Sequence, residues 1–150
     1  MYAEVLCEKA NKRHLDGYNC AQAVLLTLYE YINPEEKNVV IPKIATGFGG
    51  GLGRCGCVCG ALTGAVMAVG LKFGANEIDQ EKKADSYAKT QRLFKQFEKR
   101  HGSVMCRDLI GCDLSTPEGF AKAKGEGLFE KVCSKFIKSV IQDFLELEKS

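Results

Sequence analysis

The sequence predicts an all-α protein: a single-domain helical bundle over residues 1–150, in which a glycine-rich loop leads into a central helix of small residues. Apolar residues recur at intervals of three and four, above all in the last third of the chain, and this spacing is typical of helices that pack on a core. No stretch alternates apolar and polar residues between turn signals at hairpin spacing. A length of 150 residues, with 45% hydrophobic and 27% charged residues, suits one folded domain.

The first predicted helix begins after Asn19, a favourable N-cap residue, and ends at Asn33. Its apolar positions recur at helical intervals and include the thiol of Cys20. Residues 35–47 contain a short apolar run that Pro42 interrupts. This run predicts a short helix with an irregular start.

The central helix is predicted from about Arg54 to Phe73, with Gly74 as the residue that follows its last turn. Its 17 uncharged residues, 55–71, include four glycines. A membrane span needs about 20 predominantly apolar residues, so a helix buried in a core is the better interpretation. Three small residues, four positions apart, form a flat face on which a neighbouring helix can lie close: Gly60, Gly64 and Ala68.

Four further helices are predicted in the second half of the chain. Asn76 caps a helix whose start is acidic and whose end is basic, an order that complements the helix dipole. We expect this helix to pack through its aromatic residues, Tyr87, Phe94 and Phe97. A short helix over Val104–Ile110 stops at Gly111, Pro117 marks the start of another, and apolar spacing predicts the last over residues 129–147.

Cysteine is the unusual feature of the composition, with eight residues in 150. The amino-terminal segment has charges within its first apolar stretch and no secretory signal is visible, so a reducing cytoplasm is expected. There, clustered thiols are more often catalytic, redox-sensing or metal-binding than cross-linked. The formal net charge of +2 is too small to indicate binding of nucleic acid.

A glycine-rich loop precedes the central helix, with five glycines in the seven residues 47–53. It contains a G-x-G-x-x-G match, but no strand is predicted before it, so a dinucleotide site is rejected. Such a loop can take left-handed backbone angles and lets a ligand or another backbone approach closely. We therefore predict a substrate-binding loop, formed by Gly49, Gly50, Gly51, Gly53 and Arg54.

Three cysteines follow this loop, Cys55, Cys57 and Cys59, and the predicted helix boundary places them in its first turns. A thiol at a helix start faces free N–H groups and the positive end of the dipole, which lower its pKa. For a single cysteine, such as Cys7 or Cys133, burial as a small apolar residue is the alternative interpretation. The two histidines, His14 and His101, are predicted to be solvent-facing residues at helix ends.

Several segments together resemble the C_GCAxxG_C_C family, whose members are described as redox-active. The segments are residues 17–24 (GYNCAQAV), 47–53 (GFGGGLG), 59–64 (CGALTG) and 106–111 (CRDLIG), together with Cys133. The resemblance implies a small bacterial or archaeal protein, with a link to transporter genes and four characteristic cysteines: Cys20, Cys59, Cys106 and Cys133. The other four, Cys7, Cys55, Cys57 and Cys112, lie outside that pattern.

The leading hypothesis is a thiol protein without a confident cofactor, whose cysteines converge from separate helices. These cysteines would cycle between thiol and disulfide or carry a sulfur or metalloid adduct. Cys59 is predicted to be the attacking thiolate, helped by Arg54, with Cys20 or Cys106 as the resolving thiol and Cys133 completing the cluster. Four cysteines allow three pairings, and the sequence does not choose among them.

Two alternatives come from other functional classes. The same four cysteines, Cys20, Cys59, Cys106 and Cys133, could hold zinc or an iron–sulfur cluster, although the commonest ligand spacings are absent. The chain could instead be a redox-sensing partner of a transporter or of another redox protein, without substrate turnover. The expected small-molecule partner is a thiol, sulfur or metalloid species.

Overall fold

The structure, a computed structural model, describes residues 2–149 and is all-α, as predicted. Its helices are α1 (Tyr2–Asp16), α2 (Cys20–Ile32), α3 (Val40–Ile44), the 3₁₀ turn η1 (Thr46–Phe48), α4 (Gly60–Phe73), α5 (Gln80–His101), α6 (Cys106–Ile110), α7 (Pro117–Gly125), α8 (Leu128–Lys131) and α9 (Cys133–Leu147). An isolated antiparallel bridge joins Val58 to Met105. No helix in this part of the chain has the length and apolar character needed to span a membrane.

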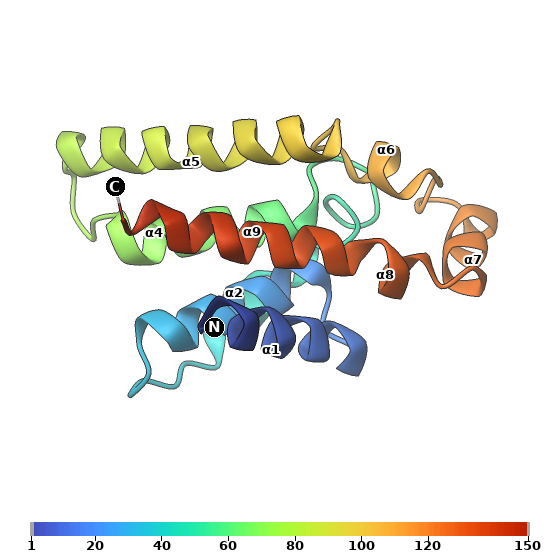
Figure 1. The fold of residues 1–150 in the computed structure, drawn as a ribbon, viewed down its shortest axis with the longest axis horizontal. Coiled ribbons are helices and arrows are strands. Elements are labelled where there is room, and N and C mark those ends of the chain that lie inside the picture. The colour runs from blue at the N-terminus through green and yellow to red at the C-terminus, as the bar shows by residue number, and fades with distance from the viewer. Residues whose placement is uncertain (1, 150) are drawn as a thin grey trace.

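The helices form three layers, with α5 on one side, α4 and α9 in the middle, and α1 and α2 on the other side (Figure 1). The short helices α6, α7 and α8 extend from one end of this stack. α4 packs against α2, α5 and α9, so it is the central helix that the sequence predicted. Apolar side chains that are almost fully buried fill the space between the layers, including Leu25, Leu62, Leu93, Phe97, Ile137 and Phe144.

The small residues of α4 allow α2 to approach its backbone closely. A Cβ atom at Gly64 would lie 2.7 Å from the carbonyl oxygen of Ala21, and a Cβ at Gly60 would lie 2.6 Å from the sulfur of Cys20. The flat face predicted for this helix is therefore confirmed. It sets the distance between the two helices that carry the first cysteines of the site.

Two predicted helix starts are wrong. The central helix begins at Gly60 rather than near Arg54, because the preceding residues 50–54 and Gly56 all have positive φ angles, which an α-helix excludes. Cys55 and Cys57 therefore lie in the loop. α5 is capped by Asp79, whose side chain accepts a hydrogen bond from the amide of Lys82, rather than by Asn76.

The remaining helix predictions are confirmed in part. α2 has a complete capping box between Asn19 and Gln22, and α7 begins at Pro117, as expected. The expected aromatic face of α5 is wrong in part, because Phe97 is buried whereas Tyr87 and Phe94 are exposed. The last helix is interrupted at residue 132, which divides it into α8 and α9, and α1 was not predicted at all.

Substitution of Gly64 by alanine is expected to lower the free energy of unfolding by about 1–3 kcal/mol, because its Cβ would collide with the α2 backbone. The matched control is Gly70→Ala, on the same helix. Nothing lies within 4 Å of a Cβ at that position, so the better helix propensity of alanine should raise stability by up to about 1 kcal/mol. Urea denaturation measures both variants, and equal stabilisation by the two would contradict the close packing of α2 on α4.

Candidate functional site

Four cysteines from distant parts of the chain surround one small cavity, which is otherwise lined by apolar residues. They are Cys20, Cys59, Cys106 and Cys133. Each lies at the start of a helix: Cys20, Cys106 and Cys133 are the first residues of α2, α6 and α9, and Cys59 is the N-cap of α4. The fold thus brings the amino-terminal ends of four helices to one place.

This inner cavity has a volume of about 10 Å³, which is close to the minimum for a single water molecule. Besides the four cysteines, its walls are Ala61, Leu109, Ile110 and Phe136. Among residues 2–149, no charged side chain lines it. The sulfur atoms therefore meet in apolar surroundings.

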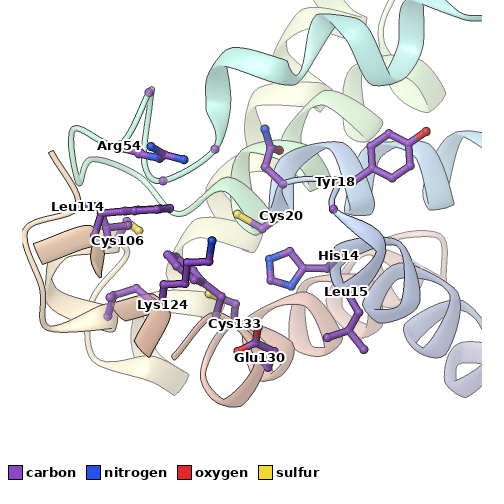
Figure 2. A pocket seen from close by; sticks show the side chains of 18 of the residues that line it. His14, Leu15, Tyr18, Cys20, Arg54, Cys106, Leu114, Lys124, Glu130 and Cys133 are labelled. Carbon is purple, nitrogen blue, oxygen red and sulfur yellow. The ribbon is translucent and has the colours of Figure 1, made fainter. Parts of the chain in front are cut away.

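The inner cavity adjoins a larger cleft of about 670 Å³, which lies between α1, α7 and the glycine-rich loop. Cys20, Cys106 and Cys133 line both spaces, whereas Cys59 lines only the inner cavity and is 5% exposed. Figure 2 shows the three shared cysteines at the base of the cleft. A molecule entering the cleft would thus reach these three sulfurs before that of Cys59.

The glycine-rich loop adopts a left-handed backbone over five consecutive residues. The φ angles of Gly50, Gly51, Leu52, Gly53 and Arg54 are 64°, 68°, 68°, 55° and 68°. This conformation costs non-glycine residues about 1–2 kcal/mol each, so Leu52 and Arg54 hold strain of the kind that is common at functional sites. The predicted left-handed geometry of the loop is confirmed.

The loop residues have two different positions relative to the cleft. Gly49, Gly50, Gly53 and Arg54 line it. Gly51 lies behind it, where a Cβ would be 2.5 Å from the backbone nitrogen of Cys57 and 2.9 Å from the Cβ of Cys106. Binding of substrate by these residues stays a prediction.

Backbone hydrogen bonds fix the loop to the segment that leads into α6. The amide of Cys106 donates to the carbonyl of Cys57 at 2.7 Å, and the amide of Cys59 donates to the carbonyl of Val104 at 2.8 Å. These bonds hold Cys59 and Cys106 in a fixed relation although the two residues are far apart in the sequence. They explain why a short, irregular segment can position two of the four sulfurs.

Burial raises the pKa of the thiols in the cluster. For Cys59 the rise is large and is due first to desolvation, although the amides of Ala61 and Leu62 donate to its sulfur and oppose the change. Desolvation also raises the pKa of Cys106 to about 12 and raises that of Cys133. The predicted lowering of the Cys59 pKa is therefore wrong: loss of water outweighs the helix start.

Cys20 combines access from the cleft with the largest set of amide donors. Burial raises the pKa of its thiol, but amides of Gly50, Ala21, Cys20 and Ala61 donate to the sulfur and oppose that rise. The sulfur lies between the starts of α2 and α4, in a space that exists because Gly60 has no side chain. Among the four cysteines, Cys20 has the best support for a negative charge.

Comparison with known proteins identifies the family of the chain. A family model described as "Putative redox-active protein (C_GCAxxG_C_C)" matches residues 18–147, which include all four. The chain belongs to this family. It is also 31% identical over 113 residues to a protein of Archaeoglobus fulgidus that is named "Uncharacterized protein", a match that covers 68% of this chain and 74% of the archaeal one. No solved structure matches the chain.

His14 is a residue of the site that sequence reasoning missed in this C_GCAxxG_C_C protein. It lies near the end of α1, lines the cleft, and points its ring toward the space between Cys20 and Cys133 (Figure 2). Burial lowers the pKa of the ring, an effect that the carboxylate of Glu130 partly opposes. The imidazole is therefore neutral near pH 7 and able to accept a proton.

The other histidine, His101, is also half-buried. His101 shares a hydrogen bond of 2.8 Å with the hydroxyl of Ser139, and its ring packs against those of Phe97 and Phe136. Both histidines are half-buried rather than fully solvent-facing, although neighbouring residues such as Leu15 and Gly102 are exposed. His101 does not line the cleft.

The cysteines outside the C_GCAxxG_C_C pattern lie elsewhere. Cys7 is buried on α1, and its thiol contacts the carbonyl of Lys138 at 3.6 Å, which agrees with an apolar core position. Cys55 and Cys112 line a separate surface groove beside Arg107. Cys57 is half-buried in the loop.

The four cysteines are of the residue type that binds zinc or an iron–sulfur cluster. Within residues 2–149, no group of three or more histidine, cysteine, aspartate or glutamate side chains has an arrangement that could hold a metal ion. The number and type of residues suit such a site, but their present geometry does not.

Proposed function

We propose that this protein is a thiol–disulfide redox protein that exchanges electrons with a small disulfide or related sulfur compound in the cleft. One observation carries the proposal: four cysteines from the starts of four helices surround one cavity, and three of them line the adjoining cleft. Membership in the family whose description is "Putative redox-active protein" supports it. A cytoplasmic location remains the expectation, because the dithiol form needs a reducing compartment.

Cys20 is the attacking thiol in this proposal, and Cys59 is the resolving thiol. Cys20 lines the cleft and its sulfur accepts several amide hydrogen bonds, whereas Cys59 lies behind it. Both sulfurs accept from the amide of Ala61, so they lie within reach of one N–H group. This order reverses the one that the position of Cys59 at a helix start had favoured.

The exchange takes place in two steps. The thiolate of Cys20 attacks one sulfur of a disulfide RS–SR, forming a mixed disulfide and releasing RS⁻. The thiolate of Cys59 then attacks the Cys20 sulfur, which forms the protein disulfide and releases a second RS⁻. The protein dithiol loses two electrons, the substrate gains them, and the two thiol protons end on the two RSH products. An external dithiol reductant restores the protein by the same exchange in reverse.

The buried thiols need a base, because burial keeps them protonated at neutral pH. His14 is suited to accept the proton of Cys20 and to deliver it to the leaving thiolate, since its ring is neutral and points into the cleft. Cys106 and Cys133 complete the cluster around the reacting pair. The other titratable or charged side chains that line the cleft with His14 are Tyr18, Cys20, Arg54, Cys106, Lys124, Glu130 and Cys133.

Disulfide mapping tests the proposal. Reaction of the reduced protein with one equivalent of a small neutral disulfide, 2,2′-dithiodipyridine, is expected to produce a bond between Cys20 and Cys59. Alkylation of the remaining thiols, proteolysis and mass spectrometry identify the linked peptides. Cys7 is the internal control, because a buried core thiol should remain free. A disulfide confined to Cys55 and Cys112, or no intramolecular disulfide, would overturn the proposal.

A cluster of four cysteines is also the usual ligand set for zinc or an iron–sulfur centre, and this is the second candidate function. It requires the four side chains to rearrange from their present positions. Metal and acid-labile sulfide analysis of protein purified without oxygen separates the two proposals. Stoichiometric metal would favour this candidate. Alkylation of all four cluster thiols in metal-free protein would favour exchange chemistry. A reversible disulfide that changes transporter binding, without turnover, would instead favour a sensor.

A further inference from the structure

We infer that the cleft selects small disulfides that carry a negatively charged group, such as a carboxylate. This inference rests on the proposed function and names the substrate class for the same site. The cleft volume of about 670 Å³ falls in the range of small-molecule sites, so it suits a compact compound better than a folded partner. The selection depends on the charged side chains around its rim.

Two cationic side chains from separate elements reach the cleft. Arg54 comes from the glycine-rich loop and Lys124 from α7, and Figure 2 shows both beside the cysteines at the base. Among residues 2–149, neither forms an ion pair. Two cations without a carboxylate partner in one cleft favour an anionic ligand.

The backbone of Arg54 is strained in this position. Its φ angle of 68° is left-handed, and its guanidinium stacks 3.9 Å from the ring centre of Phe120. Stacking uses the face of the guanidinium and leaves the N–H groups at its edge free to donate. A planar group presented edge-on in this way matches a carboxylate.

One carboxylate, that of Glu130, also lines the cleft, and it lies on the other side from Arg54. It interacts electrostatically with His14 and with Cys133. Figure 2 shows it beneath these residues, away from the guanidinium. The cleft is therefore polarised, with the cationic end able to bind the charged group of a ligand while Cys20, at the base, meets its disulfide.

The test compares three disulfides of different charge: the dianion 5,5′-dithiobis(2-nitrobenzoate), neutral 2,2′-dithiodipyridine and cationic cystamine. Each second-order rate is divided by the rate of the same compound with a free small thiol, which removes differences in intrinsic reactivity. The protein carries Cys55→Ser and Cys112→Ser, because these thiols lie outside the cluster and line a surface groove. Stopped-flow mixing at low salt gives the rates.

Arg54→Gln and Lys124→Gln are each expected to slow the reaction with the dianion by about threefold, and both together by about tenfold. The rate with the dianion should therefore fall relative to the rate with the neutral compound, the rate with the cation should rise relative to it, and adding salt to about 0.5 M should shrink these differences. Lys122→Gln is the matched control, since this exposed lysine on the same helix does not line the cleft. Loss of folding in a variant would show as a change with all three compounds.

The outcomes distinguish this inference from the proposed function. If Cys20 reacts with the neutral compound but the substitutions change all three rates equally or leave the dianion rate unaltered, selection of anions is wrong and exchange chemistry stands. If Cys20 reacts with none of the three compounds, the proposed function itself fails.

Discussion

Substitution of Cys20 by serine is expected to slow reaction with 2,2′-dithiodipyridine by at least about 100-fold, because the remaining cluster thiols lack its combination of access and amide donors. The protein again carries Cys55→Ser and Cys112→Ser. The absorbance of the released thiopyridone gives both the rate and the number of equivalents. Substitution by serine preserves the size of the side chain, so the melting temperature should change little.

Cys59→Ser is the matched variant, because it removes the proposed resolving thiol from the same cavity. It should release the first thiopyridone at an almost normal rate but not the second, and the mixed disulfide on Cys20 should accumulate. Intact-mass spectrometry detects that species directly. If Cys59→Ser abolishes the first release while Cys20→Ser preserves it, the roles of the two residues are reversed.

The sequence identified the four cysteines but not which of them a molecule in the cleft reaches first. A helix start at residue 59 argued for a reactive thiolate there, and this argument considered only local backbone geometry. Whether water reaches a sulfur depends on what packs around it, which for Cys59 includes Cys20 at the start of α2 and Cys133 at the start of α9. Burial of Cys59 therefore reversed the expected direction of its pKa. Solvation is a property of the assembled fold, and residue spacing does not contain it.

The glycine-rich loop illustrates the opposite case. Five glycines in seven positions are sufficient to predict left-handed backbone, since few other sequences tolerate it. The pattern did not reveal that Leu52 and Arg54 share this conformation, and so the helix boundary was placed too early. Hydrogen bonds within the loop hold this conformation, since the amide of Leu52 donates to the carbonyl of Phe48 and the amide of Arg54 donates to that of Gly49.

His14 could not have been assigned to the site from its neighbours in sequence. The segment Tyr2–Asp16 was not predicted as a helix, and the residue lies before the region that the family model matches. Its role depends on the packing of α1 against α9 and α2, which places the end of α1 at the cleft. Substitution of His14 therefore tests the proposed mechanism.

Replacement of His14 by glutamine is expected to slow disulfide reduction by about 100-fold at pH 7, the typical contribution of a general base. The pKa of His14 is lowered from 6.5 by burial, so the base form is complete at neutral pH and is lost only as pH falls through that lowered value. The rate of the unaltered protein should therefore vary little between about pH 7 and pH 8.5. In His14→Gln it should rise about tenfold per pH unit, because the reaction then requires the free thiolate of Cys20, whose pKa is raised above 9.0.

His101→Gln is the control for this profile, since the chain has two histidines and this second one packs between Phe97 and Phe136, outside the cleft. It should lower stability through loss of the hydrogen bond to Ser139 and leave the shape of the pH profile unchanged. Identical profiles for His14→Gln and the unaltered protein would exclude proton transfer by His14. The thiol proton would then have to leave directly to water, and the logarithm of the rate in the unaltered protein would already rise with pH at a slope close to one below about pH 8.5.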